Sequence, residues 1–313
     1  MGQIPFITSA DVEDKLTWTI IADALAAGHK GKKAEIGDLL LQHGGNAMLN
    51  RAAWIDGSGL ALKSMSVFPK NADRSPALPT IQGVMLLFDD ETGEVRALID
   101  GVLVTKWKTA GDSMLGARLL ARKNSQNLLI IGSGNVAASL IDAYLEIFPS
   151  IQQIEIWSRT YANAEKLARQ SVVKGQNVVA VSDLPAAAGR ANIISCATMS
   201  TNPVISGRWV KPGTHVDLIG AYSPQMREAD DELLQKSEIF VDARATTIAH
   251  IGELMMPLAS GAITRADILG DFYDLCKNKC GRSNEDAITV FKNGGGAHLD
   301  LLTGLAMLEV YQQ

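Results

Sequence analysis

The residues most suited to chemistry form a glycine-rich loop, Gly132-Ser133-Gly134-Asn135-Val136-Ala137, directly after the apolar run Leu128–Ile131. Between a strand and a helix, the first glycine of such a loop permits a tight turn, and the second lets the backbone approach a pyrophosphate. The third position must be small so that the helix can pack on the strand, and Ala137 meets this need. Free N–H groups at the helix start attract phosphates. The loop therefore predicts a dinucleotide site, although glycine pairs also occur in ordinary turns.

The choice of cofactor depends on Ser158-Arg159-Thr160, which ends the next predicted strand. An NAD site places Asp or Glu near this point, against the ribose 2′-hydroxyl. An acidic side chain would repel a 2′-phosphate, whereas hydroxyls and a guanidinium can bind it through charge-assisted hydrogen bonds. The alternative is a solvated arginine at a strand end. We expect NADP(H) as the cofactor, and acceptance of NAD(H) stays open.

The elements around this loop alternate between strand and helix. Apolar runs predict strands at 127–132, 153–158, 177–181, 192–196, 214–219 and 238–241, and helical patterns intervene at 135–147, 162–172, 184–188 and 224–235. Such alternation predicts an α/β fold with a Rossmann-type, doubly wound parallel sheet. Ala197-Thr198-Met199, after one of these strands, should then pass beside the cofactor ribose.

The residues before the alternating region have a different pattern. Between 36 and 110, short apolar pieces are separated by Gly, Asn and Asp, as in an antiparallel meander, and a helix is expected from Thr109 to Arg122. A strand at Ile288–Phe291 and an apolar helix at Leu299–Tyr311 close the chain, and that helix should pack on the N-terminal domain. We therefore predict an α+β substrate and dimerisation domain at 1–117, completed by 292–313, and a nucleotide-binding domain at 118–291.

Composition narrows the classes of partner. The chain has 313 residues, 47% of them hydrophobic, and a formal net charge of −5. An acidic chain argues against a nucleic-acid or membrane-surface partner, and no apolar run is long enough for a membrane span. Three cysteines outside any CxxC motif suggest a reducing, cytoplasmic compartment. His250 and Glu253 imitate a ligand pair, but the other histidines are scattered, so no metal is expected.

Several collinear motifs resemble those of the ornithine cyclodeaminase/mu-crystallin family, over essentially the whole chain. The matching pieces are Gly59–Lys63, Phe88–Gly93, Thr105–Ala110, the glycine loop, Val216–Ala221 and Thr289–Lys292. The resemblance implies a homodimer whose split N-terminal domain supplies the substrate pocket and the subunit interface. It also implies hydride chemistry at a carbon that bears nitrogen and a carboxylate. Mu-crystallin, which uses NADPH, is similar in having Asn-Arg-Thr where this chain has Ser158-Arg159-Thr160.

The resemblance also implies roles for individual residues. Lys63 matches the family's active-site lysine, and Lys63, Lys108 and Arg51 are the cations best placed to clamp a substrate carboxylate. The family's upstream substrate arginine has no clean match between Lys33 and Gln42, and a surface ion pair is an equal interpretation of Arg51. Thr80, Asn293 and Gly294 match positions on the nicotinamide side.

Two departures from the family pattern bear on the reaction. Lys108 replaces an arginine, so it keeps the charge but loses the two-pronged fork, and Asp112 in the next helical turn could simply pair with it. Tyr222 stands where the cyclodeaminases carry a catalytic Asp, and a lyase that expels ammonia needs that acid/base group. Tyr222 could close the pocket or donate a hydrogen bond there, or be a core aromatic residue.

The resulting hypothesis is an NADPH-preferring oxidoreductase that reduces small cyclic imino acids. Pyrroline-2-carboxylate and piperideine-2-carboxylate would give proline and pipecolate. One alternative is an ornithine cyclodeaminase, which would recycle NAD⁺. Another is a non-enzymatic protein that binds NADP(H) and a small ligand.

Overall fold

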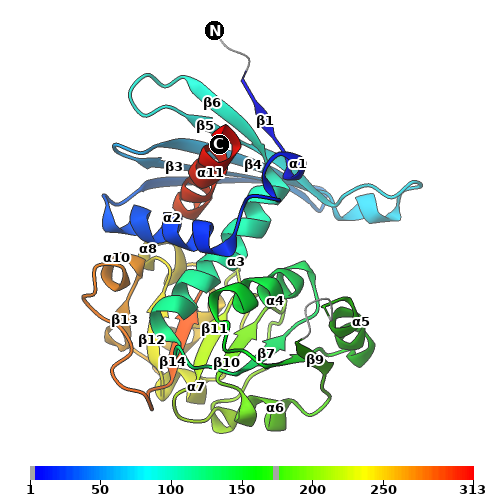
Figure 1. The fold of residues 1–313 in the computed structure, drawn as a ribbon, viewed down its shortest axis with the longest axis vertical. Coiled ribbons are helices and arrows are strands. Elements are labelled where there is room, and N and C mark those ends of the chain that lie inside the picture. Colours follow the sequence, from blue (N-terminus) through cyan, green and yellow to red (C-terminus); the bar gives the residue numbers. More distant parts are fainter. Residues whose placement is uncertain (1–3, 172–175) are drawn as a thin grey trace. The chain divides into compact units, whose positions relative to one another are not determined.

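The computed structural model describes residues 4–171 and 176–313, and the chain divides into two compact units. The first unit ends at Lys108 and resumes at Gly296, and the second runs from Thr109 to Gly295 (Figure 1). The divisions differ from the predicted 117/118 and 291/292. The predicted helix start at Thr109 is also wrong, because α3 spans Gly101–Leu120. Asp100 explains the earlier start, since its carboxylate accepts the N–H bonds of Val102 and Leu103 at 2.7 and 2.9 Å.

The first unit is built on a six-stranded sheet in the order β1-β6-β5-β4-β3-β2. Its strands are β1 (Phe6–Ile7), β2 (Glu35–His43), β3 (Asn46–Ile55), β4 (Gly59–Val67), β5 (Ile81–Phe88) and β6 (Val95–Asp100). Neighbours from β2 to β6 are antiparallel, as the meander prediction required, while β1 joins β6 in parallel. Antiparallel pairing of consecutive strands accounts for the order from β2 to β6.

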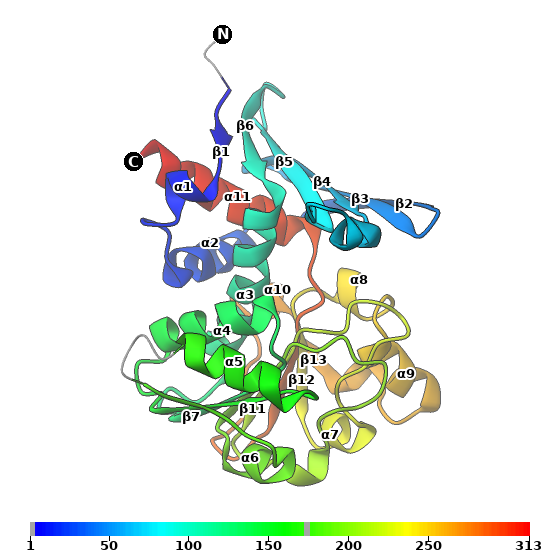
Figure 2. The ribbon, with the colours of Figure 1, turned by 90° about the vertical axis from the view of Figure 1, so that its right-hand side faces the viewer.

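Helices cover one face of that sheet. The helices of this unit are α1 (Ser9–Val12), α2 (Trp18–Lys30), the part of α3 up to Lys108, and α11 (Ala297–Gln312), with a 3₁₀ turn at Pro69–Asp73. Helix α11 packs against α2 and against strands β2 to β5, and Figure 2 shows both helices on the same side of the strands. Gly304 permits this close approach, because the Met85 side chain occupies the space that a β-carbon would need. The face that α11 covers carries Lys63 and becomes the floor of a candidate substrate site.

The second unit contains an eight-stranded, wholly parallel sheet in the order β13-β12-β14-β11-β10-β7-β8-β9. Its strands are β7 (Asn127–Ile131), β8 (Gln153–Trp157), β9 (Asn177–Ala180), β10 (Ile193–Cys196), β11 (His215–Leu218), β12 (Glu238–Val241), β13 (Ile268–Gly270) and β14 (Thr289–Lys292). The chain winds from β7 outward to β9 and then returns to β10 on the other side of β7. This topological switch point opens a crevice at the strands' carboxyl ends.

Helices flank the parallel sheet on both faces (Figure 1). Its helices are α4 (Asn135–Ile147), α5 (Tyr161–Ser171), α6 (Leu184–Arg190), α7 (Asp231–Gln235), α8 (Arg244–Thr247), α9 (Gly252–Ser260) and α10 (Phe272–Leu275), with 3₁₀ turns at Gly207–Trp209 and Arg265–Asp267. The central strands are almost wholly buried between them, which explains their continuous apolar runs. The predicted doubly wound α/β fold is confirmed.

One predicted helix of this unit is mostly absent, and several short elements were not foreseen. Residues 224–230 are irregular and only α7 is helical, because Ala229 forms a β-bridge with Ile205 and Asp230 caps α7 through the Leu233 N–H. Helices α8 and α10 have four residues each, too few for a helical period to show. Within residues 4–171 and 176–313, no helix combines the length and apolar character that a membrane crossing requires.

Candidate cofactor and substrate sites

A groove of about 360 Å³ lies at the switch point of the parallel sheet, where β7, β8 and β10 end. Predicted cofactor residues from all three strand ends line it. They are Gly132, Ser133 and Gly134 after β7, Ser158, Arg159 and Thr160 after β8, and Ala197, Thr198 and Met199 after β10. Sequence analysis did not single out the remaining lining residues, which are Trp157, Asn163, Ser200 and Val204. Carboxyl ends of neighbouring parallel strands meet at one edge, so three distant segments share one surface.

The glycine loop has the geometry that its spacing predicts. Gly132 has a φ of +131° and donates its N–H to the carbonyl of Trp157 at 2.8 Å. A β-carbon on Gly132 would lie 2.5 Å from the carbonyl oxygen of Ala197, so no larger residue fits there. Gly134 caps α4 and has open space around its α-carbon. The backbone of the loop is thus tightly packed at Gly132, whereas Gly134 has free space beside it.

The start of helix α4 faces a second hollow. Asn135 begins α4 and lines this hollow with Ser133, Asn163 and Lys166, while Val136 lines neither space. Ser133 lines both spaces, and its hydroxyl lies 3.0 Å from that of Ser158. The loops after β7 and β8 therefore present hydroxyl groups side by side in the groove.

Arg159 is exposed where β8 ends, and it forms no ion pair within the described parts of the chain. The acidic residue of this strand, Glu155, is instead held by Arg190 at 2.6 Å. The rim of the groove therefore presents a guanidinium next to two hydroxyls, which is a donor set suited to a phosphate.

A buried carboxylate that sequence analysis missed fixes the third wall of the groove. Glu228 accepts bonds from the N–H and hydroxyl of Thr198, both at 2.8 Å, and from the N–H of Gly220 at 2.7 Å. Burial raises the pKa of Glu228 to about 8, and nearby Glu253 adds to the rise, against the lowering effects of Lys292 and of the two Thr198 donors. Glu228 was missed because it lies in the irregular stretch that was predicted to be helical.

The first unit gathers three predicted cations at its helix-covered sheet face. Lys63 is 5% exposed, and its Nζ donates to Asp300 Oδ1 at 2.6 Å and to Thr105 Oγ1 at 3.3 Å. Lys108 is 6% exposed, and Arg51 lies directly opposite Lys63 in the sheet register. Burial lowers the pKa of Lys63 most; Asp300 opposes this, while Lys108 and Arg51 reinforce it. Arg51 also forms an ion pair with Asp38 at 3.0 Å. This contact agrees with the alternative interpretation of Arg51 as a member of an ion pair.

The other predicted residues are placed as follows. Tyr222 is 64% exposed, so its interpretation as a core aromatic is wrong, and it does not line the groove. Asn293 is buried, and its amide donates to the carbonyl of Thr109 and the hydroxyl of Ser113, both at 3.0 Å. Gly294 donates its N–H to Asp242, and Thr80 accepts the N–H of Phe68 before strand β5. These positions hold loops in place, and their contact with a cofactor stays a prediction.

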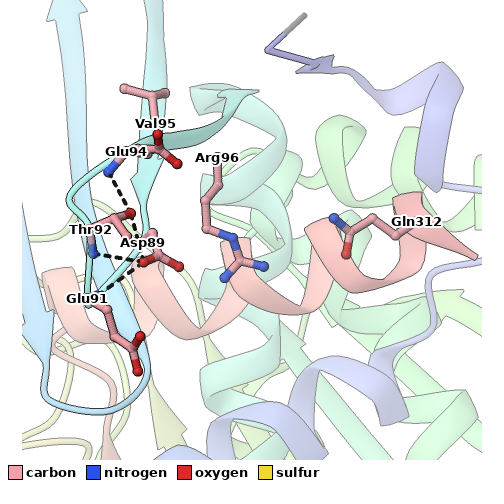
Figure 3. Close-up of a pocket in the computed structure, with 7 residues that line it drawn as sticks. All are labelled: Asp89, Glu91, Thr92, Glu94, Val95, Arg96 and Gln312. Atoms are coloured by element: carbon pink, nitrogen blue, oxygen red, sulfur yellow. Dashed lines mark hydrogen bonds between the residues drawn. The ribbon is translucent and has the colours of Figure 1, made fainter. Parts of the chain in front are cut away.

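A further hollow, of about 540 Å³, lies beside the turn between β5 and β6. Its lining residues are Asp89, Glu91, Thr92, Glu94, Val95, Arg96 and Gln312, and Asp89 accepts the N–H bonds that shape the turn (Figure 3).

His250 and Glu253, which imitate a pair of metal ligands in the sequence, have a different surrounding in the structure. Glu253 accepts the backbone N–H groups of Glu228 and Ala229. Across the described ranges, no three acidic, His or Cys side chains converge to hold a metal ion.

The parallel sheet with its glycine-loop groove at the switch point defines a Rossmann-type enzyme. The ornithine cyclodeaminase/mu-crystallin family matches residues 40–309, and the chain belongs to this family. A Delta(1)-pyrroline-2-carboxylate reductase of Paracoccus denitrificans is 51% identical over 298 residues, which are 95% of this chain and 94% of the relative. The chain is accordingly an oxidoreductase.

Solved structures agree with this assignment. The Delta(1)-pyrroline-2-carboxylate reductase of Thermococcus litoralis, in complex with NADH and L-proline, superposes with a TM-score of 0.89 at 26% identity and covers 98% of this chain and 97% of its own. An archaeal alanine dehydrogenase dimer with bound NAD has the same TM-score and identity, with coverage of 98% and 95%.

Proposed function

We propose that this oxidoreductase reduces small cyclic imino acids, such as pyrroline-2-carboxylate or piperideine-2-carboxylate, to proline or pipecolate. The observation that carries the proposal is the 51% identity to the Paracoccus reductase across nearly the full length of both chains. The Thermococcus structure, solved with L-proline, supports the same class of product.

We further propose that the cofactor is a nicotinamide dinucleotide, with NADPH preferred over NADH. The loop from Gly132 to Gly134 would hold the pyrophosphate, and Ser158, Arg159 and Thr160 would hold a 2′-phosphate. When bound, the reduced nicotinamide supplies the hydride. The Thermococcus enzyme was solved with NADH, so the preference proposed here depends on the positive charge that this chain places at residue 159.

The cation cluster of the first unit is proposed to bind the substrate carboxylate. Asp300 pairs with Lys63, and Asp38 pairs with Arg51. Lys108 is 6% exposed, and its ammonium group forms no hydrogen bond within the described residues. We infer that a carboxylate of the substrate would pair with this buried cation.

Steady consumption of NADPH with pyrroline-2-carboxylate, and formation of proline, would test the reductase directly. Ammonia release from ornithine with catalytic NAD⁺ would instead identify a cyclodeaminase. That reaction needs an acid/base group where this chain has Tyr222, and the exposed Tyr222 is less suited to that role. NADPH binding without turnover of any cyclic imine, or of a keto acid with an amine, would indicate a non-enzymatic binder.

We also infer that the enzyme is a homodimer that pairs through the uncovered sheet face of its first unit. Leu39, Leu41, Met48 and Trp54 lie on that face with exposed fractions between 43% and 55%. An apolar patch of this kind usually marks an interface. Leu39→Glu should convert the dimer to monomer in light scattering, whereas Leu269→Glu should not; Leu39 is 55% exposed, and Leu269, in the other unit, is 46% exposed. A dimer that survives Leu39→Glu would exclude this face.

A further inference from the structure

The buried ion pair between Lys63 and Asp300 joins a residue of central strand β4 to the first turn of the last helix, α11. The two side chains are 6% and 1% exposed, and Nζ lies 2.6 Å from Oδ1. Such a pair is costly to bury unless its remaining hydrogen-bonding capacity is satisfied. Asp300 Oδ2 is nevertheless buried without a hydrogen-bond partner in the described part of the chain. A pair kept at such a cost is unlike a surface ion pair that merely adds stability.

We propose that Asp300 is a positioning residue that holds the Lys63 ammonium protonated and aimed at the substrate. This inference rests on the proposed function for its consequence in turnover, but the contact itself does not depend on it.

The charges around the pair show why Lys63 needs such a partner. Lys108 from helix α3 and Arg51 from strand β3 both disfavour a charged Lys63, and burial disfavours it more strongly. Asp300 acts in the opposite direction through its charge and its hydrogen bond. His298, two residues before Asp300, stays neutral and adds no positive charge, because burial and the neighbouring His29, Lys108 and Arg51 push its pKa well below the ordinary value. Asp38 is engaged with Arg51. Asp300 is therefore the carboxylate that offsets the charge of Lys63.

The geometry also fixes direction. Thr105 Oγ1 lies 3.3 Å from Lys63 Nζ and itself donates to the carbonyl of Gly101 at 2.7 Å. An ammonium group has three N–H donors. Two of them are directed at Asp300 and Thr105, which leaves the third for an acceptor outside the protein, such as a carboxylate or an imino nitrogen. Asp300 thus keeps Lys63 protonated and orients its ammonium group.

Asp300→Asn tests the proposal, because the amide keeps the shape but removes the charge. The pKa of Lys63 should fall by about one to three units, the usual effect of an opposite charge at this distance. Since the protonated lysine is the active form, the alkaline limb of kcat/KM for the imino acid should move down by the same amount. Glu309→Gln, which removes an exposed carboxylate from the same helix, should leave the limb in place. A purely structural role would lower activity at every pH without moving the limb, and that result would overturn the proposal.

A second measurement separates this proposal from the proposed function. The rate of Lys63 acylation against pH, followed by mass spectrometry of its peptide, reports the pKa of Lys63 without any substrate. A lower value in Asp300→Asn supports the pairing even if no imine is reduced, whereas an unchanged value overturns it even if the wild type is a reductase. If Asp300→Asn does not fold, Asp300→Glu provides the test. The retained charge should leave the alkaline limb of kcat/KM at the same pH, while the displaced carboxylate should lower kcat. An unchanged kcat would contradict the positioning role.

Discussion

Replacing Arg159 by alanine is the sharpest test of how this chain chooses its cofactor. Arg159 lies at the rim of the groove next to Ser158 and Thr160, and no ion pair engages it in the part of the chain that the structure describes. Its side chain is thus available to bind a 2′-phosphate. In the proposed assignment it contacts this phosphate, which NADPH carries and NADH lacks, and no part that the two cofactors share. We expect Arg159→Ala to raise the KM for NADPH and to leave the KM for NADH nearly unchanged.

The size of the effect follows from the exposure of the arginine. A hydrogen bond to a charged group contributes about 1.5–3 kcal/mol when it is well shielded. Arg159 is exposed, so screening by solvent and salt favours the lower end of that range. At about 1.4 kcal/mol for each factor of ten, the ratio of kcat/KM for NADPH over NADH should fall roughly tenfold. Ser158→Asp should lower the ratio further, because it adds a repelling carboxylate.

Initial rates with each cofactor at saturating imino acid measure this ratio. Arg169→Ala is a matched control, because Arg169 is an exposed arginine of α5 that pairs with Glu165 and is not among the residues that line the groove. High salt should shrink the difference between wild type and Arg159→Ala, as expected for an exposed charge contact. Equal loss of affinity for NADH and NADPH would refute the assignment of Arg159 to the 2′-phosphate.

Three further perturbations probe the sites and the fold. Lys63→Met should abolish turnover while NADPH still quenches or shifts protein fluorescence; retained turnover would remove Lys63 from the chemistry. Gly132→Ala should destabilise the protein by about 1–3 kcal/mol in urea unfolding, because of its left-handed φ and the carbonyl of Ala197, whereas Gly134→Ala should weaken cofactor binding only. Burial lowers the pKa of His215 to about 3, so the stability that its neutral form contributes is present above pH 6.5 and is lost as pH falls toward 3. His215→Gln should therefore reduce the stability difference between pH 7 and pH 4 by about 3 kcal/mol, and an unchanged difference would contradict this linkage.

The positions of the central strands and the residues of the groove were the most predictable features. The runs at β7, β8, β10 and β11 are apolar because these strands are buried on both faces, so their positions show in composition alone. The crossover rule then places their carboxyl ends together, which is why residues after β7, β8 and β10 were correctly expected near one another. The short elements between Arg244 and Leu275 lacked such a signal, since four-residue helices and a three-residue strand have no period to detect.

Side-chain partners were less predictable than element positions. Tyr222 matched a functional position of the family, yet it is exposed outside the groove, and neither its type nor its neighbours in the sequence indicates this. Glu228 fixes a groove wall from a stretch that seemed helical, because a helical pattern does not reveal that a β-bridge at Ala229 competes with it. Arg51 was left between two interpretations until the register placed Asp38 opposite it.

The sequence by itself determined the local part of this protein: the glycine loop, the strand before it, the helix after it, and a positive charge at residue 159. These depend on backbone freedom, burial and charge within a short segment. Only the tertiary structure decided that Lys63 pairs with Asp300, 237 residues further along the chain. The last helix must return to the first sheet before the two side chains meet, and no spacing within the sequence encodes such a contact. The burial that results from this return is what makes the charge of Lys63 dependent on its partner.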